Sequence, residues 1–237
     1  ATPDVGTAAE VTIDTAAVYA DLPTGGVRIN FIPRDGGNTF ASSNFFSFAN
    51  ESMVGDNVTD RLRALGIRTP DKVIRNVDLN LTFGGPIVRD RFWFWASGRH
   101  TIADSQPAGV FFNKNAYDVT KWTYVPDTSR DAPQNKGVWH SLQFRGTIQA
   151  NAKNKIAFTW REQNYCRCPD RVSDTLAPEA AQDRRFPRLQ QQHVEWTSPL
   201  TNRILVEAVG MHFYERWGNM HPRVSDGNFF FPGGSLT

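Results

Sequence analysis

The chain has 237 residues, with 26 basic and 24 acidic side chains and a net charge of +2. This near balance produces no strong electrostatic field, so the composition excludes a general affinity for nucleic acid. No apolar run approaches the roughly 20 residues that a membrane-spanning helix needs. The 17 Phe and 7 Trp residues favour β-structure. The negative mean hydropathy does not separate a soluble β-protein from a transmembrane β-barrel, because barrel strands alternate in polarity.

Two short segments near the start, 9–15 and 26–32, alternate apolar and polar residues and predict β-strands. The following "PRDGGNTF" contains Pro33 and an Asp-Gly-Gly sequence, which predicts a turn. We therefore expect two short strands and then a break before residue 40.

From residue 40 onward the expected strands become long. In residues 73–83 apolar and polar side chains alternate without interruption. One face carries Val77, Leu79, Leu81 and Phe83, and the other carries Asn76, Asp78, Asn80 and Thr82. The further strands are expected at 40–49, 92–101, 139–149, 155–165, 188–197 and 203–216, which makes about seven in all. The last of these is apolar on both faces for part of its length, so the pattern does not assign its outward side.

One helical pattern interrupts the strands. Residues 56–66 place apolar side chains on one face, and Gly66 suits a C-terminal stop. We expect a single short helix inside a loop.

The connections between the long strands alternate in length. Short ones are expected at 84–90, 150–154 and 198–202, and long irregular ones at 51–72, 103–137 and 166–187. An antiparallel up-and-down sheet then has all its tight turns at one rim and all its large loops at the other, as outer-membrane barrels do. Trp93, Phe94 and Trp95 follow the first tight turn, where an interfacial aromatic girdle is expected.

A soluble β-sandwich is the alternative, because its strands also carry one apolar face. Such a chain would be a secreted or soluble module that binds carbohydrate or protein. The length of the strands and the asymmetry of the loops favour the transmembrane barrel.

Two glycine-rich segments carry a resemblance to a known family. "GGVRINFIPRDGGNTF" resembles the end of the plug domain of TonB-dependent outer-membrane receptors. "FGGPIVRDRFWFWASGR" resembles the first periplasmic turn region of the Oar-like branch, whose members usually carry a carboxypeptidase-regulatory-like domain. The similarity extends over nearly the whole chain.

The resemblance implies an all-β fold with a plug inside a barrel of about 22 strands in the bacterial outer membrane. Residues 1–39 would be the C-terminal part of the plug domain, and residues 40–237 the first barrel strands with their extracellular loops. Such a receptor imports an extracellular ligand, and a periplasmic TonB-type protein supplies the energy. Arg34, Asp35, Gly36 and Gly37 would form the plug–barrel junction.

Seven antiparallel strands leave two open edges, which the hydrocarbon region of a membrane does not tolerate. We therefore expect the chain to be an internal segment of a longer protein. Its partners would be outer-membrane lipid and the remainder of the same barrel.

The expected long loops hold the ligand-binding candidates. Aromatic faces with a few polar groups suit sugars, peptides or aromatic ligands, and the alternative is that the loops pack on each other. The candidates are Tyr117, Trp122, Tyr124, Tyr165 and Arg167.

Cys166 and Cys168 lie two residues apart, which leaves a disulfide, free thiols or a metal site open. The five histidines lack metal-ligand spacing, and neither a nucleophile elbow nor a phosphate-cradling glycine loop is present. We expect no metal, no cofactor and no enzymatic activity.

Overall fold

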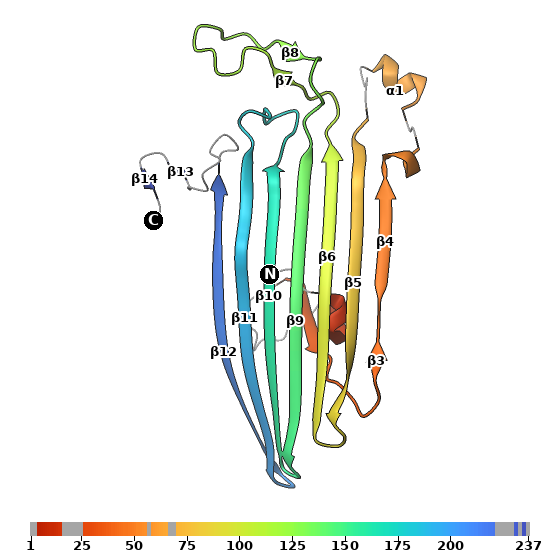
Figure 1. Cartoon of the computed structure of the whole chain (residues 1–237), viewed down its shortest axis with the longest axis vertical. Helices are drawn as coiled ribbons and strands as arrows, with labels where there is room; N and C mark the ends of the chain where they lie inside the picture. The colour runs from red at the N-terminus through yellow and green to blue at the C-terminus, as the bar shows by residue number, and fades with distance from the viewer. Residues whose placement is uncertain are drawn as a thin grey trace.

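The computed structural model describes residues 4–15, 26–55, 58–65, 70–220, 230–231 and 234–235. Within these residues the fold is all-β and every strand pairing is antiparallel. One large, tall sheet dominates the molecule, and a small hairpin lies across one of its faces (Figure 1).

The large sheet is a meander in which sequential strands are neighbours. Its order is β12-β11-β10-β9-β6-β5-β3, and β4 also pairs with β5. The strands are β3 (Ala41–Ser42), β4 (Phe45–Asn50), β5 (Lys72–Val88), β6 (Phe92–Gln106), β9 (Asn135–Asn151), β10 (Asn154–Asp170), β11 (Gln182–Thr201) and β12 (Ile204–Met220).

The remaining elements are short. The N-terminal hairpin is β1 (Ala8–Asp14) and β2 (Arg28–Pro33), preceded by a 3₁₀ turn, η1 (Val5–Thr7). The connections hold η2 (Glu51–Met53), α1 (Asp60–Ala64), and the pairs β7 (Phe112–Asn113) with β8 (Pro126–Asp127) and β13 (Phe230–Phe231) with β14 (Gly234–Ser235).

The predicted loop asymmetry is confirmed. The connections that carry α1, β7 and β8 lie at one end of the sheet together with residues 171–181, and the tight turns lie at the opposite end (Figure 1). The tight turns occupy only residues 89–91, 152–153 and 202–203. The strands therefore extend further toward both ends than the sequence pattern predicts.

The predicted turn at 84–90 is wrong in its position. Gly84 and Gly85 belong to β5, and the chain reverses only at 89–91, where Asp90 has a φ of 62°. A Cβ at Gly85 would collide with the Phe40 ring, and one at Gly84 would collide with Trp95. These glycines are explained by close packing on the sheet, which a sequence pattern does not distinguish from a turn.

The predicted strand at 40–49 is divided into β3 and β4. Thr82 of β5 causes the break, because its hydroxyl donates to the Ser43 carbonyl (2.6 Å) and its amide donates to Asn44 Oδ1 (3.1 Å). Side-chain hydrogen bonds thus replace the strand ladder at residues 43–44.

The predicted helix is present but shorter. It spans Asp60–Ala64, and the Thr59 hydroxyl accepts a hydrogen bond from the Leu62 amide as an N-cap. Residues 56–57 and the expected stop at Gly66 lie outside the described residues.

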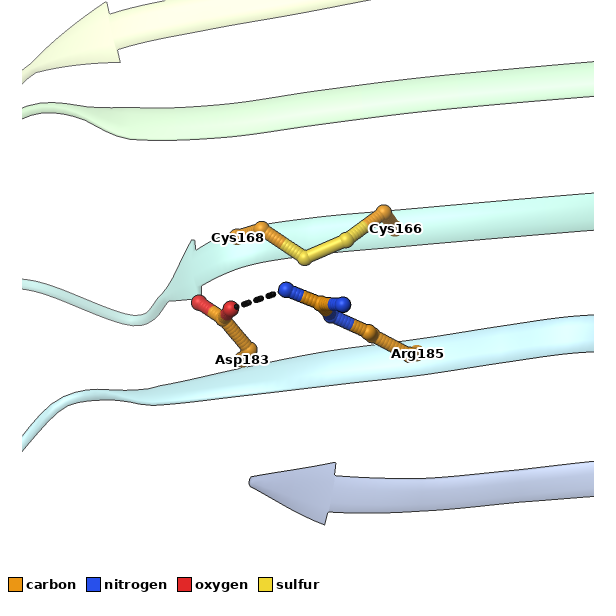
Figure 2. The surroundings of a disulfide bond; sticks show 4 residues. All are labelled: Cys166, Cys168, Asp183 and Arg185. Carbon is orange, nitrogen blue, oxygen red and sulfur yellow. Dashed lines mark hydrogen bonds and ion pairs between the residues drawn. A yellow bond between two sulfur atoms is a disulfide. The ribbon is translucent and has the colours of Figure 1, made fainter. Parts of the chain in front are cut away.

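The two cysteines lie in a strand, which corrects their assignment to a loop. β10 continues to Asp170, so Cys166 and Cys168 stand near its end and are joined by a disulfide (Figure 2). On the neighbouring strand β11 the Arg185 guanidinium forms an ion pair with Asp183 at 2.8 Å (Figure 2). Of the three states that the sequence left open for the cysteines, the structure has the bonded one.

The two faces of the large sheet differ in exposure, and the polar face is the more buried one. On β5, Leu81 and Phe83 are about half exposed (50% and 49%), whereas Thr82 between them is 3% exposed. Among the described residues, thirteen polar or charged side chains are buried against seven apolar ones. The buried side chains of the described residues are therefore mostly polar, and on β5 the large apolar side chains lie on the exposed face.

Strand register shows which residues of β12 lie on the polar face of the sheet, a question that the sequence pattern did not answer. Val209 lies opposite Glu195, Met211 opposite His193, and Phe213 opposite Gln191. Directly opposite residues share a face of the sheet, so these three apolar residues belong to the polar face.

The expected aromatic girdle is wrong for two of its three members. Trp93 lies opposite Thr147 on the polar face and donates to Asn38 Oδ1 (2.7 Å). Trp95 is 3% exposed on the same face. Only Phe94, one residue out of phase with both, belongs to the outward face.

Candidate functional site

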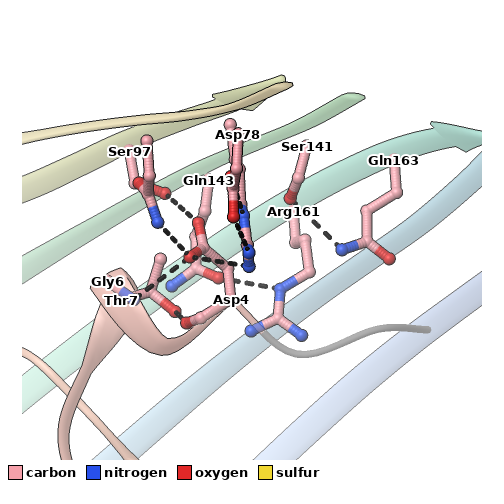
Figure 3. A network of polar contacts seen from close by, with 11 residues as sticks. Asp4, Gly6, Thr7, Asp78, Ser97, Ser141, Gln143, Arg161 and Gln163 are labelled. Carbon is pink, nitrogen blue, oxygen red and sulfur yellow. Dashed lines mark hydrogen bonds and ion pairs between the residues drawn. The ribbon is translucent and has the colours of Figure 1, made fainter. Parts of the chain in front are cut away.

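The described residues 4–15 and 26–38 are called the N-terminal segment here. This segment is attached to the polar face of the large sheet through a buried carboxylate. Asp4, just before η1, is 1% exposed. Its Oδ1 accepts from Asn80 Nδ2 of β5 (2.6 Å). Its Oδ2 accepts from Ser97 Oγ of β6 (3.3 Å; Figure 3). The Gly6 amide donates to the same carboxylate at 3.1 Å. This set satisfies a buried charge that would otherwise be very costly.

Further polar pairs surround Asp4 on the same face. Arg99 donates to both carboxylate oxygens of Asp78, at 2.9 and 2.6 Å, and its guanidinium lies 3.9 Å from Asp4. Arg161 donates to Gln143 (2.7 Å) on the neighbouring strand (Figure 3). Bidentate arginine–carboxylate geometry fixes orientation as well as charge. The face under the N-terminal segment is therefore a preorganised polar surface.

A second carboxylate attaches the other end of the segment. Asp35 Oδ1 accepts from Arg145 Nε (2.7 Å) and Thr147 Oγ1 (2.9 Å), and its Oδ2 accepts from Lys155 Nζ (2.7 Å). Arg145, whose side chain is 5% exposed, also pairs with Glu195 at 2.8 Å. The buried guanidinium of Arg145 in β9 thus connects Asp35, which follows β2, with Glu195 of β11.

The charge state of Asp35 follows from these contacts. Burial by itself raises the pKa of Asp35, but the hydrogen bonds from Lys155 and Arg145 outweigh it and hold that pKa below its ordinary value. The carboxylate therefore remains ionised at neutral and mildly acidic pH.

Three of the four predicted junction residues, Arg34, Asp35 and Gly36, lie against the large sheet. The Arg34 guanidinium stacks over the Trp95 ring at 5.0 Å, and its amide donates to the Thr7 carbonyl (2.8 Å). A Cβ on Gly36 would collide with the Phe94 backbone carbonyl, whereas Gly37 has open space around it. The assignment of residues 1–39 to a plug domain stays a prediction.

The five predicted ligand-binding residues do not converge. Tyr117, Trp122 and Tyr124 lie on the connection between β6 and β9, and Trp122 is 94% exposed. The hydroxyls of Tyr117 and Tyr124 contact the carbonyls of Glu179 and Phe111, each at 3.3 Å. Both tyrosine hydroxyls thus bond to loop backbone, as expected for loops that pack on each other.

Tyr165 and Arg167 lie in β10 instead of a loop, and they line two adjoining cavities. The cavities have volumes of about 500 and 280 Å³ and share Trp139 of β9. Trp139, Arg184 and Phe186, which the sequence pattern does not single out, are among the other residues that line them. Only strand register, which no local pattern encodes, brings them beside Tyr165.

No group of three or more His, Cys, Asp or Glu residues that could hold a metal ion is present in the part of the chain that the structure describes. His221, one of the five histidines, lies outside that part. None of the described helices is long and apolar enough to cross a membrane.

Comparisons of this chain with models of known protein families, with curated proteins and with solved structures found no match.

The first prediction concerns the close approach at Gly36. Gly36→Ala should destabilise the attachment by about 1–3 kcal/mol, because the new methyl group meets a backbone carbonyl that cannot rotate away. Denaturant unfolding and amide hydrogen exchange of β1 and β2 measure the effect. Gly37→Ala is the matched control and should leave both unchanged. Equal effects of the two substitutions would contradict the close contact.

The second prediction concerns pH. The pKa of Asp35 is lower in the folded state than in the unfolded state, where it is about 3.9. The contribution of Asp35 to the free energy of unfolding is therefore fully present above that unfolded-state pKa, and it is lost as pH falls through the folded-state pKa. Asp35→Asn should cost about 1–3 kcal/mol at pH 7. The difference in unfolding free energy between the two proteins should stay constant down to about pH 5 and shrink only below about pH 4. A difference that is independent of pH rules out the charged pairing.

Proposed function

We propose that this chain is part of a TonB-dependent outer-membrane receptor that binds an extracellular ligand and imports it through a plugged β-barrel. The strands from residue 40 onward contribute to the barrel wall, and residues 1–39 contribute to the plug inside it. One observation carries the proposal: the large sheet exposes its apolar face and covers its polar face.

Lipid is the solvent that stabilises such an inverted sheet. In a soluble β-sandwich the face of Leu81, Phe83 and Leu142 would be sealed against a second sheet, yet these side chains are 49–56% exposed. Among the described residues, it is the polar face that another segment covers. A transmembrane barrel has this arrangement, with apolar residues toward lipid and polar ones toward the interior.

The height of the apolar face fits a bilayer. On β5 the apolar positions alternate from Val77 to Ile87, ten residue steps or about 33 Å along the strand. At the tilt of about 40° that barrel strands adopt, this corresponds to a band about 25 Å tall, close to that of outer-membrane proteins.

The two ends of the sheet give the proposal its direction. Outer-membrane barrels have short periplasmic turns and longer extracellular loops. The end with α1, β7 and β8 would then face outward, and the cavities beside Trp139 would open toward the extracellular side. The tight turns would face the periplasm, where a TonB-type protein acts on the plug.

The two edge strands of the large sheet indicate which further strands the proposed barrel needs. β12 and β4 each pair with one strand only among the described residues. An unpaired edge is not stable in hydrocarbon, so the proposal includes further strands that close the barrel.

The proposal predicts the effect of a charge on the outward face. Leu81→Arg, in the middle of the apolar band, should destabilise the protein in lipid bilayers by about 2–4 kcal/mol. Val119→Arg is the matched control, because Val119 is 86% exposed on the connection between β6 and β9. Denaturant unfolding in vesicles measures both variants, and Val119→Arg should be neutral.

A soluble module gives the opposite result. A half-exposed leucine in water tolerates arginine within about 0.5 kcal/mol. If the protein is monodisperse without detergent and Leu81→Arg is as stable as the parent, the receptor proposal fails.

A further inference from the structure

We propose that the polar face carries an oxyanion-binding site at the long-loop end, in which Arg167 of β10 and Arg184 of β11 clamp a carboxylate, phosphate or sulfate group. As the ligand site of a receptor, this clamp rests on the proposed function and deepens it by naming the chemical class of the ligand.

Strand register places the two arginines face to face. Arg167 is the direct cross-strand partner of Arg184, and Tyr165 is the partner of Phe186 at the adjacent inward position. Like charges directly opposite each other destabilise a sheet. From this pairing we infer that a compensating anion belongs between the two guanidinium groups.

Each arginine is held over an aromatic ring of its own strand. The Arg167 Cζ lies 5.5 Å from the Tyr165 ring centroid, and the Arg184 Cζ lies 5.4 Å from that of Phe186. The two rings are themselves 5.8 Å apart. Stacking on a ring uses the face of a guanidinium and leaves its N–H edge free for an acceptor. The two guanidinium groups thus lie side by side, each held in place by the aromatic ring next to it.

The hydrogen-bonding capacity of the clamp is unsatisfied. Arg184 Nε is buried and has no acceptor, and among the described residues Arg184 has no ion pair. Among the described residues, the one ion pair of Arg167 is with Asp170 at 3.7 Å, and that carboxylate is shared with Arg171 at 3.5 Å. A buried donor without an acceptor costs free energy that a bound oxyanion would recover.

The charge balance of the surrounding cavities is positive. Their lining includes four cations, Lys136, Arg167, Arg171 and Arg184, and two carboxylates, Asp170 and Glu215. Guanidinium groups bind oxyanions through two parallel hydrogen bonds, which selects planar or tetrahedral oxygen acceptors over halide ions. Trp139 and Tyr165 add aromatic surface for a sugar or apolar part of the same ligand.

The test uses three simple oxyanions as probes. The purified full chain is titrated with inorganic phosphate, sulfate and acetate at constant ionic strength set with chloride. At least one probe should bind saturably by calorimetry and raise the unfolding temperature. Arg184→Gln should weaken that binding by about tenfold or more, because it removes a charge-assisted hydrogen bond.

Arg185→Gln is the matched control. Arg185 is the next residue on the same strand, faces the opposite side and is already paired with Asp183. It should bind the probe with the affinity of the parent protein. In the absence of any probe, Arg184→Gln should be at least as stable as the parent, because the variant relieves the repulsion with Arg167.

Two results would overturn the clamp: no saturable binding of any of the three probes, or equal weakening by Arg184→Gln and Arg185→Gln. These results are separable from failure of the proposed function. A chain that requires detergent yet binds none of the probes disproves the clamp alone. Anion binding by a chain that stays monodisperse without detergent disproves the receptor alone.

Discussion

The requirement that buried polar groups find partners governs this structure. The charged and amide side chains of the large sheet lie on the face that the N-terminal segment covers. Each one that is buried there needs a hydrogen-bond partner, because desolvation without one costs free energy. Asp4 and Asp35 provide such partners at two separate points, to Asn80 and Ser97 in one case and to Arg145 and Lys155 in the other. Because hydrogen bonds to carboxylates are directional, these contacts set the position of the described N-terminal residues on the sheet.

The outward face is the counterpart of this constraint. With its polar face covered, the sheet leaves most of its large apolar side chains on the other face, where apolar surroundings would stabilise them. An exposed apolar face, a covered polar face, tight turns at one end and loops at the other form a set that is consistent with the proposed lipid surroundings. The proposed receptor function follows from the set as a whole, because each feature alone also occurs in soluble β-proteins.

The two charged regions of the polar face differ in their completeness. Around Arg145 the acids and bases are matched within the chain, since Asp35 and Glu195 flank the guanidinium. Around Arg184 they are not, and a buried nitrogen lacks an acceptor. A matched cluster holds the fold together, whereas an unmatched one is available to a ligand. This contrast, rather than the number of exposed aromatic residues in the loops, identifies the region of the sheet that is suited to bind an anion.

By itself the sequence determined what depends on local pattern. Alternation along β5 established a two-faced strand, and alternating loop lengths established which connections share an end, because both follow from neighbouring residues. Tertiary structure alone decided what depends on packing and register. Gly84 and Gly85 lie in a strand because rings pack on them, and Val209 joins the polar face because it lies opposite Glu195. Arg167 meets Arg184 for the same reason: cross-strand pairing joins residues that are distant in the chain, and no local pattern records which residue will be opposite.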